Sequence, residues 1–201
     1  MNLVCLDMEG VLTPEIWIEF AKETGIKELE RTTRDEPDYD KLMKFRIDLL
    51  RERGLKLKDV VAVCNRVDVL PGARQFLDEL RTFAQVIIVS DTYIEFAMPL
   101  MEKLGYPTLF CNELEVDDEG YICDYKQRCE HNKYDTVRGL QGIGIQTIAA
   151  GDSHNDVGMI QASKAGFFFR TTDAIKQEYP QYPALDTYEE LLEAIKGALT
   201  K

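Results

Sequence analysis

The segment Leu3–Pro14, LVCLDMEGVLTP, combines an apolar run with an acidic end and a turn. Its first part, Leu3 to Asp7, is almost wholly apolar and finishes in a carboxylate. A short apolar run bounded by turn residues is typical of a strand that is buried on both faces. We therefore expect a first strand at 3–7, with Asp7 at its carboxyl end and Glu9 just beyond it.

Outward from this strand, apolar runs and helical patterns alternate along the chain. The other expected strands are Val86–Ser90, Gln146–Ala150 and Gly166–Phe169, with a short one at Thr108–Phe110 and a hairpin over Glu113–Tyr125 that turns at 118–120. The helical patterns include Pro71–Phe83, Asn155–Lys164 and an amphipathic terminal helix from Tyr188. This alternation predicts an α/β fold with a Rossmann-like parallel sheet covered by helices on both faces.

One long interval interrupts the alternation. Residues 8–85 separate the first two clear strands, which is far more than a normal crossover needs. The interval has helical patterns throughout. Its expected boundaries are an N-cap at Thr13 with Pro14 at the first helical position, a stop at Gly25, a second helix after Asp38 and a third over Lys58–Arg66. We expect residues 13–70, here named the cap segment, to form a small inserted all-helical cap, with 1–12 and 71–201 as the α/β core.

Composition narrows the class of protein. The chain has 201 residues and a formal net charge of −12, which disfavours nucleic acid or an anionic membrane as a partner. Its five cysteines are scattered, without a CxxC pair, and are expected to be free thiols. No run approaches the roughly 18 apolar residues that span a bilayer, and no signal peptide is evident. A cytoplasmic location is the expectation.

Polar side chains gather at the carboxyl ends of three expected strands. These residues are Asp7 and Glu9 after the first strand, Ser90 and Asp91 after the second, and Asp152, Asn155 and Asp156 after the third. Ligands of open α/β sheets bind at this edge. Any one of these residues alone could instead be a helix N-cap after a strand. Three such ends together favour a functional site.

Oxygen ligands without histidine or cysteine favour Mg²⁺. A carboxylate can also attack phosphorus and form an acyl-phosphate. Phosphoryl transfer then needs positive charge near the phosphoryl oxygens and an acid/base for the leaving and entering groups. The sequence offers Ser90 as a hydrogen-bond donor, Lys133 as a cation and Glu9 as the acid/base.

These residues carry a family resemblance. The segments DMEGVLT (7–13), VSD (89–91) and GDSHND (151–156), together with Lys133, resemble the four motifs of the haloacid dehalogenase superfamily of phosphatases in order and spacing. The resemblance implies Asp7 as nucleophile and Glu9 as general acid/base. It implies Ser90 and Lys133 as phosphate ligands. It also implies a Mg²⁺ site made by Asp7, the Glu9 carbonyl and Asp152, with Asn155 or Asp156 in support.

The second acidic position departs from the common pattern, in which an aspartate stands two residues after the nucleophile. Glu9 is one methylene longer and slightly less acidic, with a reference pKa of about 4.3 against 3.9. It can still carry a proton. The departure leaves open an acceptor other than water.

Two residues of the cap segment are candidates for substrate recognition. Arg46 falls on the apolar face of the second cap helix, where a cation needs an anionic partner. It could hold a substrate carboxylate, could pair with a glutamate of the cap, or could extend its charged end to solvent. Glu15 could bind an ammonium group or could be solvated. Trp17 recurs with Phe20 and Ala21 at helical spacing, so we expect it in the apolar core of the cap.

Glu15 and Arg46 resemble the cap residues with which phosphoserine phosphatases read the amino acid. The segment DMEGVLTPEIW (7–17) is similar to the branch of bifunctional phosphoserine phosphatase/homoserine phosphotransferases. The resemblance implies a Mg²⁺-dependent enzyme that moves phosphate from phosphoserine to water or homoserine, and a homodimer. The alternatives are a phosphatase for another small phosphorylated metabolite and a non-catalytic sensor of a phosphorylated ligand. In this interpretation Ser90, Asp91, Lys133 and Asn155 line the substrate site with Glu15 and Arg46.

Overall fold

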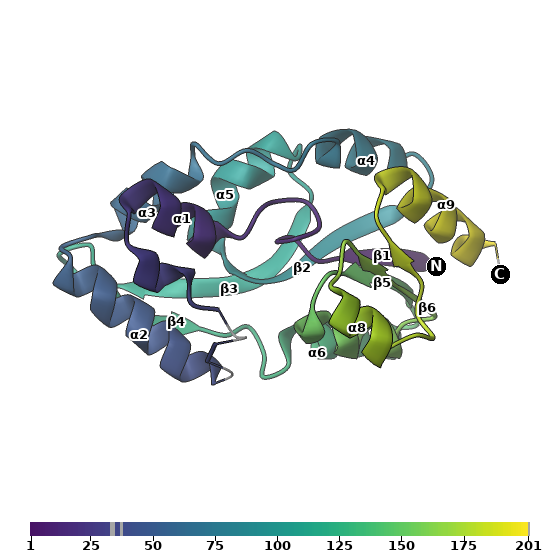
Figure 1. Ribbon diagram of the computed structural model, residues 1–201. Coiled ribbons are helices and arrows are strands. Elements are labelled where there is room, and N and C mark those ends of the chain that lie inside the picture. The colour runs from purple at the N-terminus through teal and green to yellow at the C-terminus, as the bar shows by residue number, and fades with distance from the viewer. Residues whose placement is uncertain (33–34, 37, 201) are drawn as a thin grey trace.

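A seven-stranded sheet with the strand order β4-β3-β2-β1-β5-β6-β7 forms the centre of the computed structural model, which describes residues 1–32, 35–36 and 38–200 (Figure 1). The strands are β1 Asn2–Leu6, β2 Gln85–Tyr93, β3 Thr108–Val116, β4 Ile122–Lys126, β5 Gln146–Gly151, β6 Ala165–Phe169 and β7 Ala184–Leu185. Neighbouring strands are parallel except for the β3–β4 hairpin. The α/β fold with a mainly parallel sheet is thereby confirmed.

Helices cover both faces of the sheet. The helices outside the cap segment are α4 Ala73–Leu80, α5 Ile94–Lys103, α6 Asn132–Gly142, α7 Val157–Ala162, α8 Asp173–Glu178 and α9 Tyr188–Leu199, with a short 3₁₀ helix, η2, at His154–Asp156. In Figure 1, α4, α5 and α9 lie on one face, and α6 and α8 on the other. Side chains of β1 alternate between two apolar clusters, Val4 and Leu6 on the first face and Leu3 and Cys5 on the second. This alternation explains why the strands are apolar throughout.

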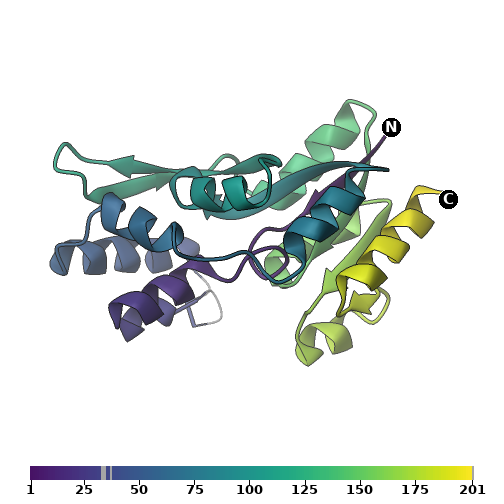
Figure 2. The ribbon, with the colours of Figure 1, turned by 90° about the horizontal axis from the view of Figure 1, so that it is seen from above.

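The cap segment contains four helical elements among its described residues. They are α1 Ile16–Thr24, the 3₁₀ helix η1 Lys27–Glu30, α2 Tyr39–Glu52 and α3 Leu57–Cys64. They lie together at the end of the molecule that holds the β3–β4 hairpin, and Figure 2 shows the same grouping from above. This arrangement suits a cap over the sheet edge. The domain boundaries at 12–13 and 70–71 stay a prediction.

The predicted start of the first cap helix is wrong by two residues. Thr13 forms a bridge with Glu9, and its backbone N–H donates to the Met8 carbonyl at 3.0 Å. Residues 8–13 therefore close a tight loop, and the helix begins at Ile16 with Glu15 as its N-cap. The predicted stop is confirmed, because Gly25 caps the helix in the left-handed region with φ of 73°.

The region of β2 and β3 also differs from the expectation. β2 continues past Ser90 to Tyr93, and the short strand and the first arm of the hairpin are one strand, β3. β3 pairs with β2 through its first half and with β4 through its second half. The two halves therefore look like separate short strands in the sequence. The predicted turn is confirmed by the hydrogen bond from Gly120 N–H to the Asp117 carbonyl at 2.9 Å.

All five cysteines are free thiols, as expected. Within the described residues, helices that combine the length and the apolar character needed to cross a bilayer are absent.

Candidate active site

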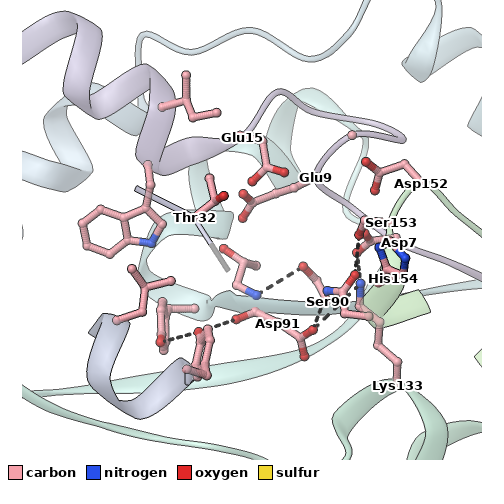
Figure 3. A pocket seen from close by; sticks show the side chains of 18 of the residues that line it. Asp7, Glu9, Glu15, Thr32, Ser90, Asp91, Lys133, Asp152, Ser153 and His154 are labelled. Atoms are coloured by element: carbon pink, nitrogen blue, oxygen red, sulfur yellow. Dashed lines mark hydrogen bonds and ion pairs between the residues drawn. The ribbon is translucent and has the colours of Figure 1, made fainter. Parts of the chain in front are cut away.

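A cavity of about 640 Å³ lies at the carboxyl ends of β1, β2 and β5 and extends to α1 and α2 (Figure 3). Nine of the ten predicted site residues line it: Asp7, Glu9, Glu15, Arg46, Ser90, Asp91, Lys133, Asp152 and Asn155. The tenth, Asp156, is fully buried beside them and does not line the cavity. The structure therefore brings the predicted residues together, while their chemical roles stay predictions.

Asp7 is buried at the end of β1, with 4% of its surface exposed. Its backbone N–H donates to the Ala150 carbonyl at 2.9 Å, which continues the pairing of β1 with β5. Its Oδ1 accepts from Met8 N–H at 2.7 Å and lies 2.9 Å from Lys133 Nζ. Burial and the neighbouring Asp156 raise the pKa of Asp7 well above its ordinary value. The carboxylate is fixed in direction through Oδ1, and among the described residues Oδ2 has no hydrogen-bond donor.

Lys133 joins Asp7 to the loop after β5. Its Nζ donates to Asp156 Oδ1 at 2.6 Å, while Asp156 Oδ2 accepts from the backbone N–H groups of Asp152 and Ser153 at 2.9 and 3.0 Å. Burial alone would lower the pKa of Lys133, but Asp156 and Asp7 raise it well above its ordinary value. The ammonium is therefore charged, and Asp156 holds it in place.

Two glycines allow the loops to approach so closely. A Cβ on Gly151 would clash with Asp156 Cγ, and a Cβ on Gly10 would lie 2.5 Å from Asp152 Cγ. A side chain at either position would force the neighbouring carboxylate to move. Gly10 also has φ of 80°, which disfavours a side chain.

The carboxylates of Asp7, Asp152 and Asp156 form a cluster whose ligand atoms lie within 4.8 Å of one another. Burial, followed by the charge of Asp156, raises the pKa of Asp152 to about 7. Lys133 alone does not balance three carboxylates. An oxygen-only donor set of this kind fits Mg²⁺.

Glu9 and Glu15 lie side by side on the cap side of the cavity (Figure 3). The N–H of Ile16 donates to Glu9 Oε2 at 3.1 Å, which places Glu9 at the start of α1. Burial, then the charge of Glu15 and a hydrogen bond with it, raise the pKa of Glu9 to about 8, although a hydrogen bond with Thr92 acts in the opposite direction. Glu9 can therefore carry a proton near neutral pH.

Arg46 is buried on α2, with 6% of its surface exposed. Its guanidinium lies 4.5 Å from the centroid of the Trp17 ring, and one terminal nitrogen donates to the Arg31 carbonyl at 2.8 Å. Its Nε has no hydrogen-bond partner among the described residues. The side chain does not extend to solvent, and within the described part of the chain it has no salt bridge to a glutamate. A buried, incompletely bonded cation facing a cavity fits an anionic ligand.

Sequence reasoning did not place several residues that also line the cavity, among them Trp17, Tyr39, Thr92 and Tyr93. Trp17 is buried, as expected of cap core, but it also contributes a wall of the cavity. His154 lies at the cavity as well, and its side chain is 60% exposed with Nε2 2.9 Å from Glu178 Oε2. The helical spacing of Trp17 predicted that its side chain is buried. It could not show that the same side chain also borders the cavity.

Comparisons with known proteins found a family model and related sequences. A family model described as haloacid dehalogenase-like hydrolase matches residues 1–164. The chain is 48% identical to phosphoserine phosphatase ThrH of Pseudomonas aeruginosa, over 95% of this chain and 93% of that protein. It is 47% identical to a phosphoserine phosphatase of Pseudomonas syringae, over 95% and 81% of the two chains.

Solved structures share the fold. A phosphoserine phosphatase described as a phospho-aspartyl intermediate analogue matches with a TM-score of 0.75 and 22% identity, over 96% of this chain and 97% of that chain. A phosphoserine phosphatase from T. onnurineus also matches with a TM-score of 0.75, at 24% identity, over 97% and 94%.

Proposed function

Because the chain belongs to the haloacid dehalogenase-like hydrolase family, we propose that it is a Mg²⁺-dependent phosphoserine phosphatase that works through an aspartyl-phosphate on Asp7. The observation that carries the substrate assignment is Arg46. A buried guanidinium with an unbonded Nε faces the same cavity as the Asp7–Lys133 pair. A small molecule with a phosphate at one end and a carboxylate at the other would satisfy both. The names of the relatives support this choice.

The phosphate end of the substrate would lie between Asp7, Ser90 and Lys133. The charged Lys133 ammonium and the Ser90 hydroxyl, in the last half of β2, would bind phosphoryl oxygens. Asp7, Asp152, Asp156 and the Glu9 carbonyl would hold Mg²⁺, which supplies positive charge to the phosphoryl group when bound.

The reaction would proceed in two displacements. The free oxygen of Asp7 attacks phosphorus, the bond from phosphorus to the serine oxygen breaks, and Glu9 gives its proton to that oxygen. Glu9 then takes a proton from the acceptor hydroxyl, whose oxygen attacks phosphorus and frees the Asp7 carboxylate. The raised pKa of Glu9, about 8, suits both roles.

The amino acid end would lie against the cap segment. Arg46 would bind the carboxylate, and Glu15, at the N-cap of α1, would bind the ammonium group. Glu15 beside Glu9 would also keep the proton on Glu9 until substrate arrives. Homoserine, which has the same carboxylate and ammonium groups with a hydroxyl, would be a second acceptor after serine leaves.

The first test is turnover of O-phosphoserine with Mg²⁺, with and without homoserine. We expect inorganic phosphate in the first reaction and O-phosphohomoserine in the second. Release of inorganic phosphate without formation of O-phosphohomoserine would contradict the transfer to homoserine and leave the phosphatase proposal in place. Release of no phosphate at any enzyme concentration would favour the non-catalytic sensor and overturn the proposal.

The second test separates phosphoserine from other small phosphates. Arg46→Ala should raise KM for phosphoserine about 10- to 100-fold, as expected for the loss of hydrogen bonds to a charged group. KM for O-phosphoethanolamine, which lacks the carboxylate, should stay unchanged. Lys44→Ala, at an exposed position on the same helix, is the matched control. Equal effects of Arg46→Ala on both substrates would contradict the amino acid assignment.

A further inference from the structure

Asp91, two residues before the end of β2, is hydrogen-bonded to four other segments of the chain. Its Oδ2 accepts from Asn155 Nδ2 at 2.9 Å, and its Oδ1 accepts from Asn132 Nδ2 at 3.0 Å. Its backbone carbonyl accepts from Asn112 Nδ2 at 3.0 Å and from the Tyr39 hydroxyl at 3.4 Å. These partners belong to the loop after β5, to α6, to β3 and to the cap segment. One residue of β2 therefore connects the loop after β5, α6, β3 and the cap segment.

Two of these partners are buried amides that the proposed reaction does not use. Asn112 is 2% exposed and Asn132 is 7% exposed. A buried amide is costly unless its donors and acceptors are bonded. Asn132 Nδ2 also donates to the Ser90 carbonyl at 2.8 Å, and Asn112 Oδ1 accepts from Arg128 N–H at 3.0 Å. These hydrogen bonds fix both amide groups in orientations in which they donate to Asp91.

The backbone of β2 explains how Asp91 comes to point into the cavity. The pairing of β2 with β3 shifts in register between Val89 and Tyr93. Irregularities of this kind re-aim a side chain and are common next to active sites. Figure 3 shows Asp91 between the cap side of the cavity and Lys133.

The chemistry of the partners explains why this residue is an acid. Asn155 and Asn132 both present N–H donors, and only a carboxylate offers an acceptor oxygen to each of them. A negative charge beside a phosphate site costs electrostatic energy. Lys133 Nζ, 3.9 Å from Asp91 Oδ2, offsets part of that cost. The Asp91 carboxylate beside the phosphate site therefore needs a structural explanation.

We propose that Asp91 is a positioning residue whose carboxylate fixes Asn155 on one side and Asn132, with the adjacent Lys133, on the other side of the phosphate site. It differs from a substrate ligand in that its two oxygens bind protein amides. The inference rests on the proposed function only in taking this end of the cavity as the place where phosphate binds.

The test is an exchange of the two groups that meet at 2.9 Å. Asn155→Asp sets two carboxylates against each other, and we expect kcat/KM for phosphoserine to fall about 100-fold, as for a misplaced group. Adding Asp91→Asn restores both bonds, because the introduced amide would accept from Asn132 and donate to the new carboxylate. The double variant keeps the net charge of the native site. We expect it to regain at least tenfold over Asn155→Asp.

The matched control combines Asn155→Asp with Asp118→Asn, which removes an exposed carboxylate outside the cavity. It should regain nothing. Thermal unfolding of each variant checks that losses of activity are not losses of fold. If the double variant is no more active than Asn155→Asp, the contact does not set the position of Asn155. If Asp91→Asn alone raises KM only for substrates with an ammonium group, Asp91 binds substrate. Either result overturns the proposal.

A second readout makes the inference independent of the substrate. The dissociation constant of inorganic phosphate, measured by calorimetry with Mg²⁺ present, should weaken in Asn155→Asp and recover in the double variant. If native protein binds inorganic phosphate but does not hydrolyse phosphoserine, the proposed function fails while the exchange still tests Asp91. If binding of inorganic phosphate does not recover in the double variant, the positioning role fails.

Discussion

The carboxyl groups of Glu9 and Glu15 share a hydrogen bond on the cap side of the cavity, although each would carry a negative charge in water. Two carboxyl groups in this relationship hold a proton between them. Glu9 belongs to the loop after β1, and Glu15 is the N-cap of α1. Beside burial, the start of the cap segment therefore helps to keep the proposed acid/base protonated.

This pair predicts a pH dependence. Glu9 must be protonated to release serine, and its pKa in the protein without substrate is raised to about 8, so kcat/KM for phosphoserine should fall as pH rises above about 8. Glu15→Gln removes the charge that helps to raise this pKa, and the alkaline fall should move to lower pH by about one unit. Glu23→Gln, exposed on the same helix, should leave the profile unchanged. An unmoved profile in Glu15→Gln would show that another group sets the alkaline limb.

The contact between Arg46 and Trp17 predicts an effect on substrate affinity. The ring holds the guanidinium at 4.5 Å, and such contacts contribute about 0.5–2 kcal/mol. Trp17→Leu should raise KM for phosphoserine roughly 3- to 30-fold and should change kcat little. Steady-state kinetics measures both constants.

Phe20→Leu is the matched control for this change, since Phe20 is fully buried on the same helix and does not line the cavity. Both variants should lose about 1–3 kcal/mol of stability, but only Trp17→Leu should alter KM. Equal KM values in the two variants would mean that Trp17 serves packing alone.

Gly10 allows a separation of backbone strain from a steric clash. An alanine there would adopt φ near 80° and would bring Cβ to 2.5 Å from Asp152 Cγ. Gly144 has φ of 84° with nothing within 4 Å of an added Cβ. Gly144→Ala should lose about 1–2 kcal/mol in the free energy of unfolding from backbone strain alone, and Gly10→Ala should lose more because the clash adds to the strain.

Only Gly10→Ala should also lose activity, by about 100-fold, because it displaces a proposed metal ligand. Urea unfolding and phosphate release measure the two effects. Full activity in Gly10→Ala would show that the position of Asp152 is not critical.

The sequence predicted the parts of the fold that local pattern controls. β1, β5 and β6 are apolar runs, and each was found within one or two residues. The predicted start of α1 was wrong because Thr13 pairs with Glu9. The preference of threonine for helix N-caps does not show such a contact. β7 was missed because two residues, Ala184 and Leu185, are too short to make a pattern.

The site could be predicted where it depends on sheet topology. Parallel strands bring their carboxyl ends to one edge, so Asp7, Ser90 and Asp152 had to lie near one another. Tyr39 and Trp17 could not be assigned in this way. Tyr39 reaches the cavity because α2 packs against β4 at the edge of the sheet. The Trp17 ring packs against Phe96 of α5. Both are contacts between residues far apart in the sequence, which no local pattern shows.

The cluster of Asp7, Asp152 and Asp156 predicts that Mg²⁺ stabilises the fold. Three carboxylates around one ammonium repel one another, and a cation relieves the repulsion. MgCl2 at about 100 times its dissociation constant should add about 2.7 kcal/mol to the free energy of unfolding, and Tm should rise. Asp152→Asn should lose this rise, whereas Asp118→Asn should keep it. Sodium chloride at equal ionic strength controls for screening.

The same carboxylate predicts the sign of a pH effect in the metal-free protein. The pKa of Asp152 is about 7 in the folded state against 3.8 as its ordinary value, so the folded state holds more protons between these two pH values. Stability should therefore fall as pH rises from about 4 to about 7. Metal-free Asp152→Asn should match the native protein near pH 4 and should be more stable than it at about pH 7.5. The opposite result would be a metal-free native protein that is more stable than Asp152→Asn at about pH 7.5. It would show that the three carboxylates do not repel one another strongly, and the inference of a cation site would fail.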